Sequence, residues 1–351
     1  MDTKPLVASG APEAPVRTTL RFEGTPGEYF KIWIVNVALT AVTLGIFSAW
    51  AKVRSKRYLY GNTFIGDHAF DYHAPPLRIL LGRAIALALL IGYSISAIMA
   101  PPSAALWYLV LIIAFPWMIK SSLRFAARNT SYRNIRFDFH GGYWGALKAF
   151  ILWPILAVVT ILIMLPYSRR ARDYYNINNH SFGPFAFRAD IPIRELYERY
   201  LQALFALVVG VIALSVLAAA ILALMPNLST AGITILSYTV FGTGIAAFPA
   251  FVGAMTFNVA INHMRLGDEF RFESRLSALW MSWLAVSNLA AIVFSLGLAY
   301  PWARIRRTRY MASCISVIGS ADIGDVTSAP VAAGSAVGEE MASFLDIDFG
   351  L

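Results

Sequence analysis

Cysteine and charged side chains are scarce in this 351-residue sequence. Cys314 is the only cysteine, which excludes an internal disulfide and a cysteine-based metal cluster. Charged residues make up 14% of the chain, whereas soluble domains carry roughly a quarter. Because 58% of the residues are hydrophobic, the composition argues against a soluble fold.

Short motifs that mark common enzyme sites are also missing. The sequence contains no G-x-x-x-x-G-K-[ST] phosphate loop, no H-E-x-x-H zinc motif and no G-x-S-x-G nucleophile motif. Nothing in the first 28 residues combines a basic start with an apolar run, so we expect no cleavable signal peptide. We therefore expect neither catalysis nor a bound cofactor.

Seven apolar segments account for the composition. Four of them contain no Asp, Glu, Lys or Arg, and these are residues 32–51, 149–167, 232–257 and 276–302. The other three are residues 79–100, 104–119 and 201–225. Since roughly 20 helical residues cross a bilayer core of ~30 Å, the sequence predicts an α-helical multi-pass membrane protein.

A motif recurs after the apolar segments. SAWAKVRSKRY, from Ser48, and YPWARIRRTRY, from Tyr300, share the pattern W-A-[KR]-[VI]-R-x-x-R-Y, and weaker copies begin at Phe115, Leu165 and Phe248. Twelve residues beyond the aligned aromatic position, four of the five copies carry Asn. These asparagines are Asn62, Asn129, Asn179 and Asn262. The sequence therefore predicts internal repeats, in which Asn ends a helix in the left-handed conformation.

The residues after each Asn alternate between apolar and polar around a turn. This pattern predicts short β-hairpins at 62–73, 129–140, 179–189 and 262–273, and LRFEG near Leu20 could supply one more strand. Isolated hairpins are marginal in water, so we expect them to pair into one sheet outside the membrane. The expected fold is thus a membrane protein built from internal repeats, whose hairpins after the helices form a cytoplasmic β layer.

The spacing of the copies predicts how the chain is divided. The predicted parts are a disordered N-terminal arm (1–17), two three-segment membrane units (18–140 and 141–274), a half repeat (275–312) and an acidic tail rich in small residues (313–351). The acidic tail could stay disordered or dock on the basic motifs.

Lys and Arg near the segment ends decide between two topologies. If each apolar segment crossed the membrane once, the basic residues would divide almost evenly between the two sides. If the odd segments are re-entrant, every basic motif and the C-terminus face the cytoplasm. Asn36, Asn288 and Pro154 lie in mid-segment, where a broken helix would need them. We expect the one-sided topology, with seven simple spans as the alternative.

Aromatic and basic residues of the strong motif copies predict anchors at the lipid headgroups. They are Trp50, Lys52, Arg54, Arg57 and Tyr58 in the first copy and Trp302, Arg304, Arg306, Arg309 and Tyr310 in the last. The net charge of +9 fits anionic headgroups of the bilayer better than nucleic acid. Recognition of an anionic substrate by the same residues is the alternative.

Four further residues could ligate a metal if the hairpins converged. They are His73, His140, Asp190 and Glu273, each eleven residues beyond the repeated Asn. The same residues would serve equally well as polar strand ends at a membrane surface. We therefore expect no metal site.

The sequence resembles the YjgN-like family of bacterial inner-membrane proteins, which has no known function. TLGIFSAWAKVRSKRY with its hairpin, YPWARIRRTRY and the closing GEEMASFLDIDFGL carry the resemblance, from about residue 18 to the end. The resemblance implies an inner-membrane, multi-pass protein and offers no catalytic residues.

Two functions are compatible with these features. Internally repeated, broken helices commonly surround a transport path, so a transporter or channel is our leading hypothesis. A non-transporting scaffold that binds lipid headgroups or a partner is the alternative. A continuous polar cavity would favour the transporter, and a sealed interior would favour the scaffold.

Overall fold

The computed structural model describes residues 16–99, 102–225 and 229–319, in which short strands alternate with pairs of helices. The first run is β2 (Arg21–Phe22), α1 (Pro26–Val42), α2 (Ser48–Gly61) and β3 (Thr63–Ile65). The second is β4 (His68–Tyr72), α3 (Pro76–Met99), α4 (Ser103–Arg128) and β5 (Thr130–Tyr132). The third is β6 (Ile135–Phe139), α5 (Tyr143–Leu147), the π-helical η1 (Lys148–Leu152), α6 (Trp153–Val159), α7 (Leu165–Asn178) and β7 (His180–Phe182). The fourth is β8 (Phe185–Ala189), α8 (Ile193–Leu224), α9 (Thr230–Asn262) and β9 (Met264–Leu266). The fifth is β10 (Phe270–Ser274), α10 (Ala278–Phe294), α11 (Tyr300–Ser313) and β11 (Ile315–Gly319).

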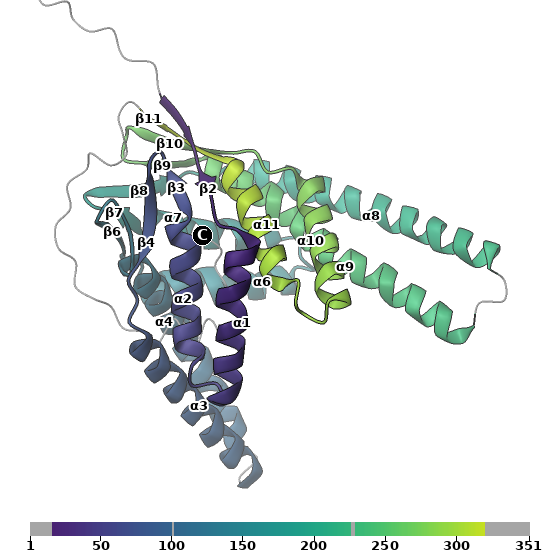
Figure 1. Ribbon diagram of the computed structural model, residues 1–351, viewed down its shortest axis with the longest axis horizontal. Coiled ribbons are helices and arrows are strands. Elements are labelled where there is room, and N and C mark those ends of the chain that lie inside the picture. Colours follow the sequence, from purple (N-terminus) through teal and green to yellow (C-terminus); the bar gives the residue numbers. More distant parts are fainter. Residues whose placement is uncertain (1–15, 100–101, 226–228, 320–351) are drawn as a thin grey trace, which may run out of the picture.

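All the strands belong to one antiparallel sheet that is nearly closed into a barrel (Figure 1). In the 11-stranded order β1-β11-β10-β9-β8-β7-β6-β5-β4-β3-β2, the two edge strands are neighbours in the sequence. β1 (Val16–Thr19) pairs with β11 and β2 pairs with β3, so the N-terminal segment reaches both edges. The predicted hairpins, their shared sheet and the extra strand near Leu20 are confirmed.

The interior of the sheet is packed with apolar side chains. Tyr132, Phe182 and Phe270 are almost fully buried in one cluster of strand residues. Across the even-numbered strands runs a row of four phenylalanines, and the centroids of neighbouring rings lie 6.0 to 6.3 Å apart. The row is Phe70, Phe137, Phe187 and Phe272. The sheet therefore encloses a packed core.

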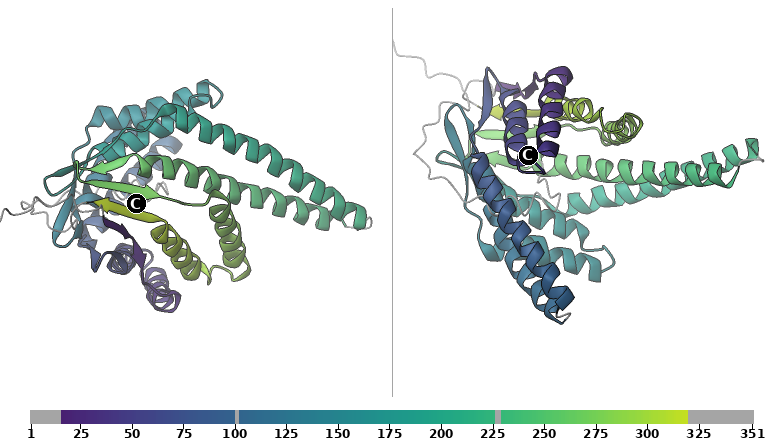
Figure 2. Two further views of the ribbon diagram at one scale, coloured as in Figure 1. Left: turned by 90° about the horizontal axis from the view of Figure 1, so that it is seen from above. Right: turned by 60° about the horizontal axis from the view of Figure 1, so that its bottom comes forward.

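Two of the helix pairs are long. α3 and α4 have 24 and 26 residues, and α8 and α9 have 32 and 33. Each of these helices contains a candidate membrane span by length and composition. The two long pairs diverge from the sheet as separate arms (Figure 1, Figure 2).

The other three helix pairs are short and return to the sheet through five-residue turns. Each turn holds two successive residues with positive φ, such as Leu44 with Gly45 and Leu296 with Gly297. Hydrogen bonds within the turn satisfy its amides: Gly45 N–H donates to Thr40 O (2.8 Å). Leu44 and Leu296 are 94% exposed at the tips. An apolar tip whose backbone is satisfied internally can enter lipid, where unpaired polar groups are costly.

This arrangement decides between the two topologies. Because even-numbered strands lead into helix pairs and odd-numbered strands follow them, every pair leaves and rejoins the antiparallel sheet along one rim. Seven simple spans would place successive strands on opposite sides of a membrane, so that alternative is wrong. The short pairs leave and rejoin the sheet at the same rim, an arrangement that is compatible with the one-sided topology.

The expected position of the helix break is wrong at Asn36 and Asn288, whereas at Pro154 the α-helix is interrupted by η1 just before the proline. α1 and α10 continue through Asn36 and Asn288, and the turns come several residues later. Both asparagines instead join the two helices of a pair, because their Nδ2 atoms donate to Ala51 O (3.3 Å) and Ala303 O (3.2 Å). The arm at residues 1–15 and the acidic tail from residue 320 lie outside the described residues.

Candidate functional site

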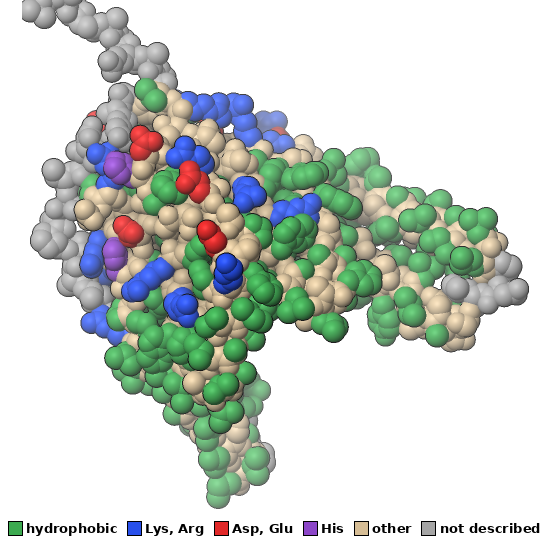
Figure 3. All heavy atoms as spheres, in the orientation of Figure 1, with side chains coloured by type: hydrophobic (Ala, Val, Ile, Leu, Met, Phe, Trp, Pro, Cys, Tyr) green, Lys and Arg blue, Asp and Glu red, His purple; other side chains and the backbone are tan. Residues whose placement is uncertain are grey.

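Charged side chains gather where the helix pairs meet the sheet (Figure 3). Residues 84–119 and 200–264, which form most of the two long arms, contain no Asp, Glu, Lys or Arg. The arms are accordingly covered with apolar side chains (Figure 3). We refer to the motif residues of α2 and α11, which carry the predicted anchors, as the basic layer.

In the first helix pair, cations of the basic layer hold helices and sheet together. Arg54 Nη1 donates to Asn36 Oδ1 (3.3 Å), which links α2 to α1. Arg57 Nε donates to Tyr72 O (3.2 Å) at the end of β4. Trp50 packs against the neighbouring apolar cluster, and Lys52 is half-buried. The predicted anchors of the first copy therefore make structural contacts between the helices and the sheet.

The last helix pair repeats this pattern with differences. Arg306 Nη1 donates to Asn288 Oδ1 (3.2 Å) and to Ser287 Oγ (2.7 Å), and the guanidinium lies 5.0 Å from the centroid of the Trp302 ring. Arg309 Nη2 donates to Gly24 O (2.9 Å), just before α1. Arg304 is half-buried, like Lys52 in the first pair. The basic layer thus ties the last pair to the first.

The tyrosine that ends the motif closes each short helix pair. The Tyr58 hydroxyl accepts from Thr25 N–H (2.8 Å), and the Tyr310 hydroxyl accepts from Ser277 N–H (2.8 Å). In the middle pair, the Tyr175 hydroxyl donates to Gly142 O (3.0 Å). In all three cases the partner is the N-cap residue 33 positions earlier. That constant spacing was the signal in the sequence, and it was missed.

The repeated asparagines end helices through their side chains. The Nδ2 atoms of Asn62, Asn129 and Asn179 each donate to the carbonyl four residues earlier at 2.7 Å. Their φ values lie between −107° and −94°, so the expected left-handed conformation is wrong. The side-chain hydrogen bond closes the last turn without it.

The fourth asparagine is displaced by one position. The cap residue of α9 is His263, and Asn262 is the last residue of the helix. Its Oδ1 accepts from Ser274 N–H (2.6 Å), the role that Asn178 has toward Ala189 N–H (2.6 Å). Asn262 therefore corresponds in position to Asn178 rather than to Asn179.

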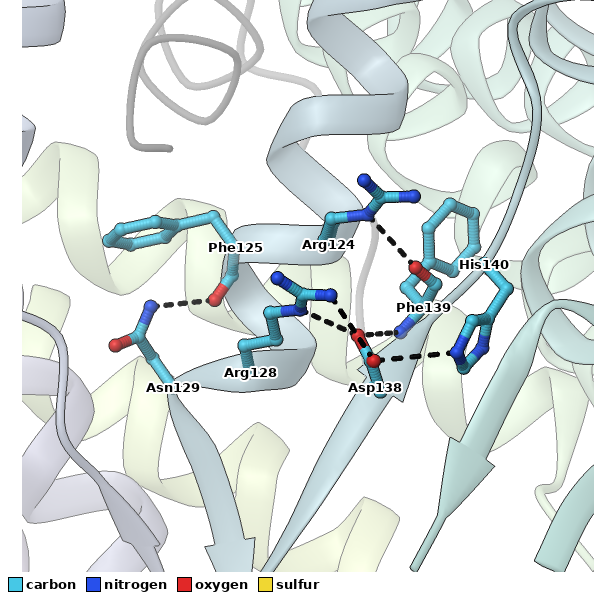
Figure 4. A network of polar contacts seen from close by, with 7 residues as sticks. All are labelled: Arg124, Phe125, Arg128, Asn129, Asp138, Phe139 and His140. Carbon is cyan, nitrogen blue, oxygen red and sulfur yellow. Dashed lines mark hydrogen bonds and ion pairs between the residues drawn. The ribbon is translucent and has the colours of Figure 1, made fainter. Parts of the chain in front are cut away.

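A polar network joins α4 to the end of β6 (Figure 4). Arg128 Nε lies 2.8 Å from Asp138 Oδ1, His140 Nε2 lies 3.4 Å from Asp138 Oδ2, and Arg124 Nε donates to Phe139 O (3.1 Å). Burial alone would raise the pKa of Asp138, but the Arg128 guanidinium and the Phe139 N–H hold it below its usual range. The network is a structural ion pair between helix and sheet.

The metal candidates do not converge. The four residues lie at the ends of alternate strands or just after them. Because neighbouring strands are about 4.8 Å apart, alternate strands are separated by roughly 10 Å. His73 Nε2 contacts Ser131 Oγ (2.7 Å), Asp190 lies 3.9 Å from Arg170, and Glu273 lies 2.9 Å from Arg17. His140 is the residue already paired with Asp138. Within residues 16–99, 102–225 and 229–319, no three His, Cys, Asp or Glu residues are placed to hold a metal.

Two cavities open at the helix–sheet junction. One of about 320 Å³ lies between α10, α11 and the start of α1, and its lining includes Arg306 and Arg309. Another of about 210 Å³ lies between the bases of α8 and α9, where Glu195, Arg199 and Asn258 contribute polar atoms. Both cavities lie outside the packed interior of the sheet.

Comparison with known proteins places the chain among bacterial membrane proteins. The inner membrane protein YjgN of Salmonella typhimurium strain LT2 is 25% identical over 360 aligned residues, which cover 88% of this chain and 91% of that protein. The inner membrane protein YjgN of Escherichia coli K12 is 33% identical over 144 residues, or 39% of this chain and 35% of that one. No solved structure matches the chain. The model of a family described as bacterial protein of unknown function (DUF898) matches residues 17–344, in agreement with the resemblance seen in the motifs. The chain belongs to the DUF898 family.

Proposed function

We propose that this protein is a non-transporting scaffold of the bacterial inner membrane, which holds a closed sheet against the cytoplasmic surface and binds anionic lipid headgroups. The observation that carries the proposal is the filled interior of the sheet. Phe182 is 1% exposed, its ring lies 4.9 Å from that of Phe137 on the neighbouring strand, and both pack in a buried cluster with residues from β3 to β11. A transport path along the axis of the sheet would need the space that these rings occupy.

The proposed architecture consists of five internal repeats, each a strand, two helices and a strand. In this grouping the half repeat expected at 275–312 becomes a complete unit, since β10 precedes α10 and β11 follows α11. The equal spacing of the three tyrosine contacts supports it, and so do the three five-residue turns. The units differ mainly in helix length. The long helix pairs of two units would span the membrane, and the short pairs of the other three would enter it and return on the same side.

The sheet is proposed to face the cytoplasm. Basic residues cluster at the sheet end and are absent from the outer parts of both long arms, and positive charge marks cytoplasmic ends of membrane helices. Salmonella YjgN is named an inner membrane protein, which supports the same membrane for this chain. The cytoplasmic surface of the inner membrane carries anionic lipids, and each Lys or Arg near that surface gains about 1 kcal/mol of binding energy from them.

Scaffold and transporter differ in two measurable properties. Purified protein reconstituted into liposomes should give no release of carboxyfluorescein and no proton or potassium flux above that of protein-free liposomes. It should also retain anionic phospholipid through purification in mild detergent. A saturable ion flux through the reconstituted protein would contradict the proposal and support the transporter.

Orientation needs a separate test. In a Cys314→Ser background, single cysteines at Asp67 and Asp268, in two hairpin turns of the sheet, should react with a membrane-impermeant maleimide only in inverted vesicles. A cysteine at Leu44, the tip of the first re-entrant pair, should react from neither side. Reaction of the Asp67→Cys protein in intact cells would contradict the cytoplasmic sheet.

A further inference from the structure

The cavity between the last helix pair and α1 combines cations with aromatic walls. Its volume is about 320 Å³, and its lining includes Pro26, Trp280, Trp302, Arg306, Arg309 and Tyr310. Trp280 and Leu284 come from α10, whereas both arginines come from α11. Trp280, which lines the cavity, is exposed beside Leu279 and Trp283 on α10, so the cavity adjoins an apolar surface of that helix.

The two guanidinium groups of this cavity have only neutral partners. Arg306 donates to Ser287 and Asn288, and Arg309 donates to a backbone carbonyl. Among the described residues, neither arginine has a carboxylate within ion-pair distance. Two positive charges one helical turn apart, one of them over the Trp302 ring, form a favourable site for an anion, and a guanidinium fork fits phosphate oxygens.

The first helix pair provides an internal comparison. Its N-cap Thr25 is followed three residues later by Glu28, whereas the N-cap Ser277 is followed three residues later by Trp280. The Tyr58 hydroxyl donates to Glu28 Oε2 (2.9 Å), so a carboxylate stands beside the motif of the first pair. At the last pair an indole replaces that carboxylate, which leaves the positive charge uncompensated and adds an apolar wall.

We propose that this cavity binds the phosphate of an anionic membrane lipid, with Arg306 and Arg309 on the phosphate and the acyl chains lying along Trp280, Leu284 and Trp302. The inference rests on the proposed headgroup-binding function and assigns it to one site. Free phosphate shares the chemistry of the headgroup, but only a lipid would use the apolar wall.

Native mass spectrometry of the full-length protein in detergent tests the site. Titration with phosphatidylglycerol should show one lipid bound at least tenfold more tightly than phosphatidylcholine, and inorganic phosphate at the same concentration should not displace it. Arg306→Gln with Arg309→Gln should weaken the first phosphatidylglycerol at least tenfold. Trp280→Glu should have a similar effect, because it restores the carboxylate found at the first pair and leaves both arginines in place.

A matched control removes two cations elsewhere. Arg265→Gln with Arg271→Gln changes two exposed arginines on neighbouring strands of the sheet and should leave lipid binding unchanged. If the variants of Arg306, Arg309 and Trp280 bound phosphatidylglycerol like the wild type, the assignment of the lipid to this cavity would be wrong. The proposal that the protein binds headgroups through the rest of the basic layer would be unaffected. Failure of the wild type to prefer phosphatidylglycerol would overturn both proposals. Displacement by inorganic phosphate would assign the cavity to free phosphate and overturn the lipid.

Discussion

Replacing Phe182 with Ala tests whether the sheet encloses a packed core. Phe182 is 1% exposed, and its ring centroid lies 4.9 Å from that of Phe137 and 6.2 Å from that of Tyr132. Truncation of a buried Phe costs about 3–5 kcal/mol through lost transfer energy and the cavity left behind. At roughly 2–4 °C per kcal/mol, the unfolding temperature should fall by at least about 6 °C.

The assay is thermal unfolding of purified protein in detergent, followed by intrinsic tryptophan fluorescence. Phe205→Ala is the matched control, because Phe205 is 72% exposed on α8 and removal of its ring should leave the unfolding temperature nearly unchanged. Equal unfolding temperatures for Phe182→Ala and the wild type would refute the packed interior. Ion flux through folded Phe182→Ala protein, absent in the wild type, would show instead that this ring closes a path.

Three further changes test the helix–sheet contacts and the basic layer. Asp138→Asn should lower the free energy of unfolding by about 1–3 kcal/mol at pH 7. Folding lowers the pKa of Asp138, so the ionised carboxylate stabilises the folded state at pH values above its ordinary pKa of 3.8. This stabilisation is lost as the pH falls through the lowered pKa of the folded state, so the unfolding curves of the variant and the wild type should converge in acid. Tyr175→Phe should cost about 0.5–1.5 kcal/mol through the lost bond to Gly142, whereas Tyr174→Phe, at an exposed position, should cost little. Four cations of α2, when changed together to Glu, should prevent normal membrane insertion as measured by fractionation, with milder loss for Gln at the same positions. The four are Lys52, Arg54, Lys56 and Arg57. Normal insertion of the Glu variant would contradict the anchor role.

Local patterns in the sequence placed the strands of the four hairpins and β2, but not β11, which lies in the predicted acidic tail, or β1, which overlaps the predicted N-terminal arm. Period-two alternation around residues such as Gly66 or Asn134 located all four hairpins, because a turn with positive φ and the side-chain alternation are both local properties. The absence of charge likewise located the arms. The basic motif located α2 and α11, since it repeats almost identically in the two helices.

Other features depended on contacts that a linear pattern does not contain. Spacing alone paired Asn262 with the other asparagines, but α9 includes Asn262 and is capped one residue later by His263. The turn before β10 also has three residues where the first hairpin has two, which offsets the second strand of the fourth hairpin further. Asn36 looked like a helix breaker, yet its side chain is satisfied by α2 and the helix continues. The cavity at Arg306 became visible only when α10, α11 and the start of α1 were placed together.

The N-terminal segment pairs with strands at both ends of the sheet, and it thereby holds the first and last helix pairs against each other. Leu20 N–H donates to Ile315 O (2.9 Å) and Glu23 N–H donates to Asn62 O (3.0 Å), so one short segment joins the two ends of the nearly closed sheet. The same segment brings α1 against α11, where Phe22 and Ile305 share a buried cluster. An open sheet would leave two rows of unpaired backbone groups and separate the first helix pair from the last. The lipid site proposed at the last pair therefore depends on β1 and β2, because its wall at Pro26 exists only in the closed sheet.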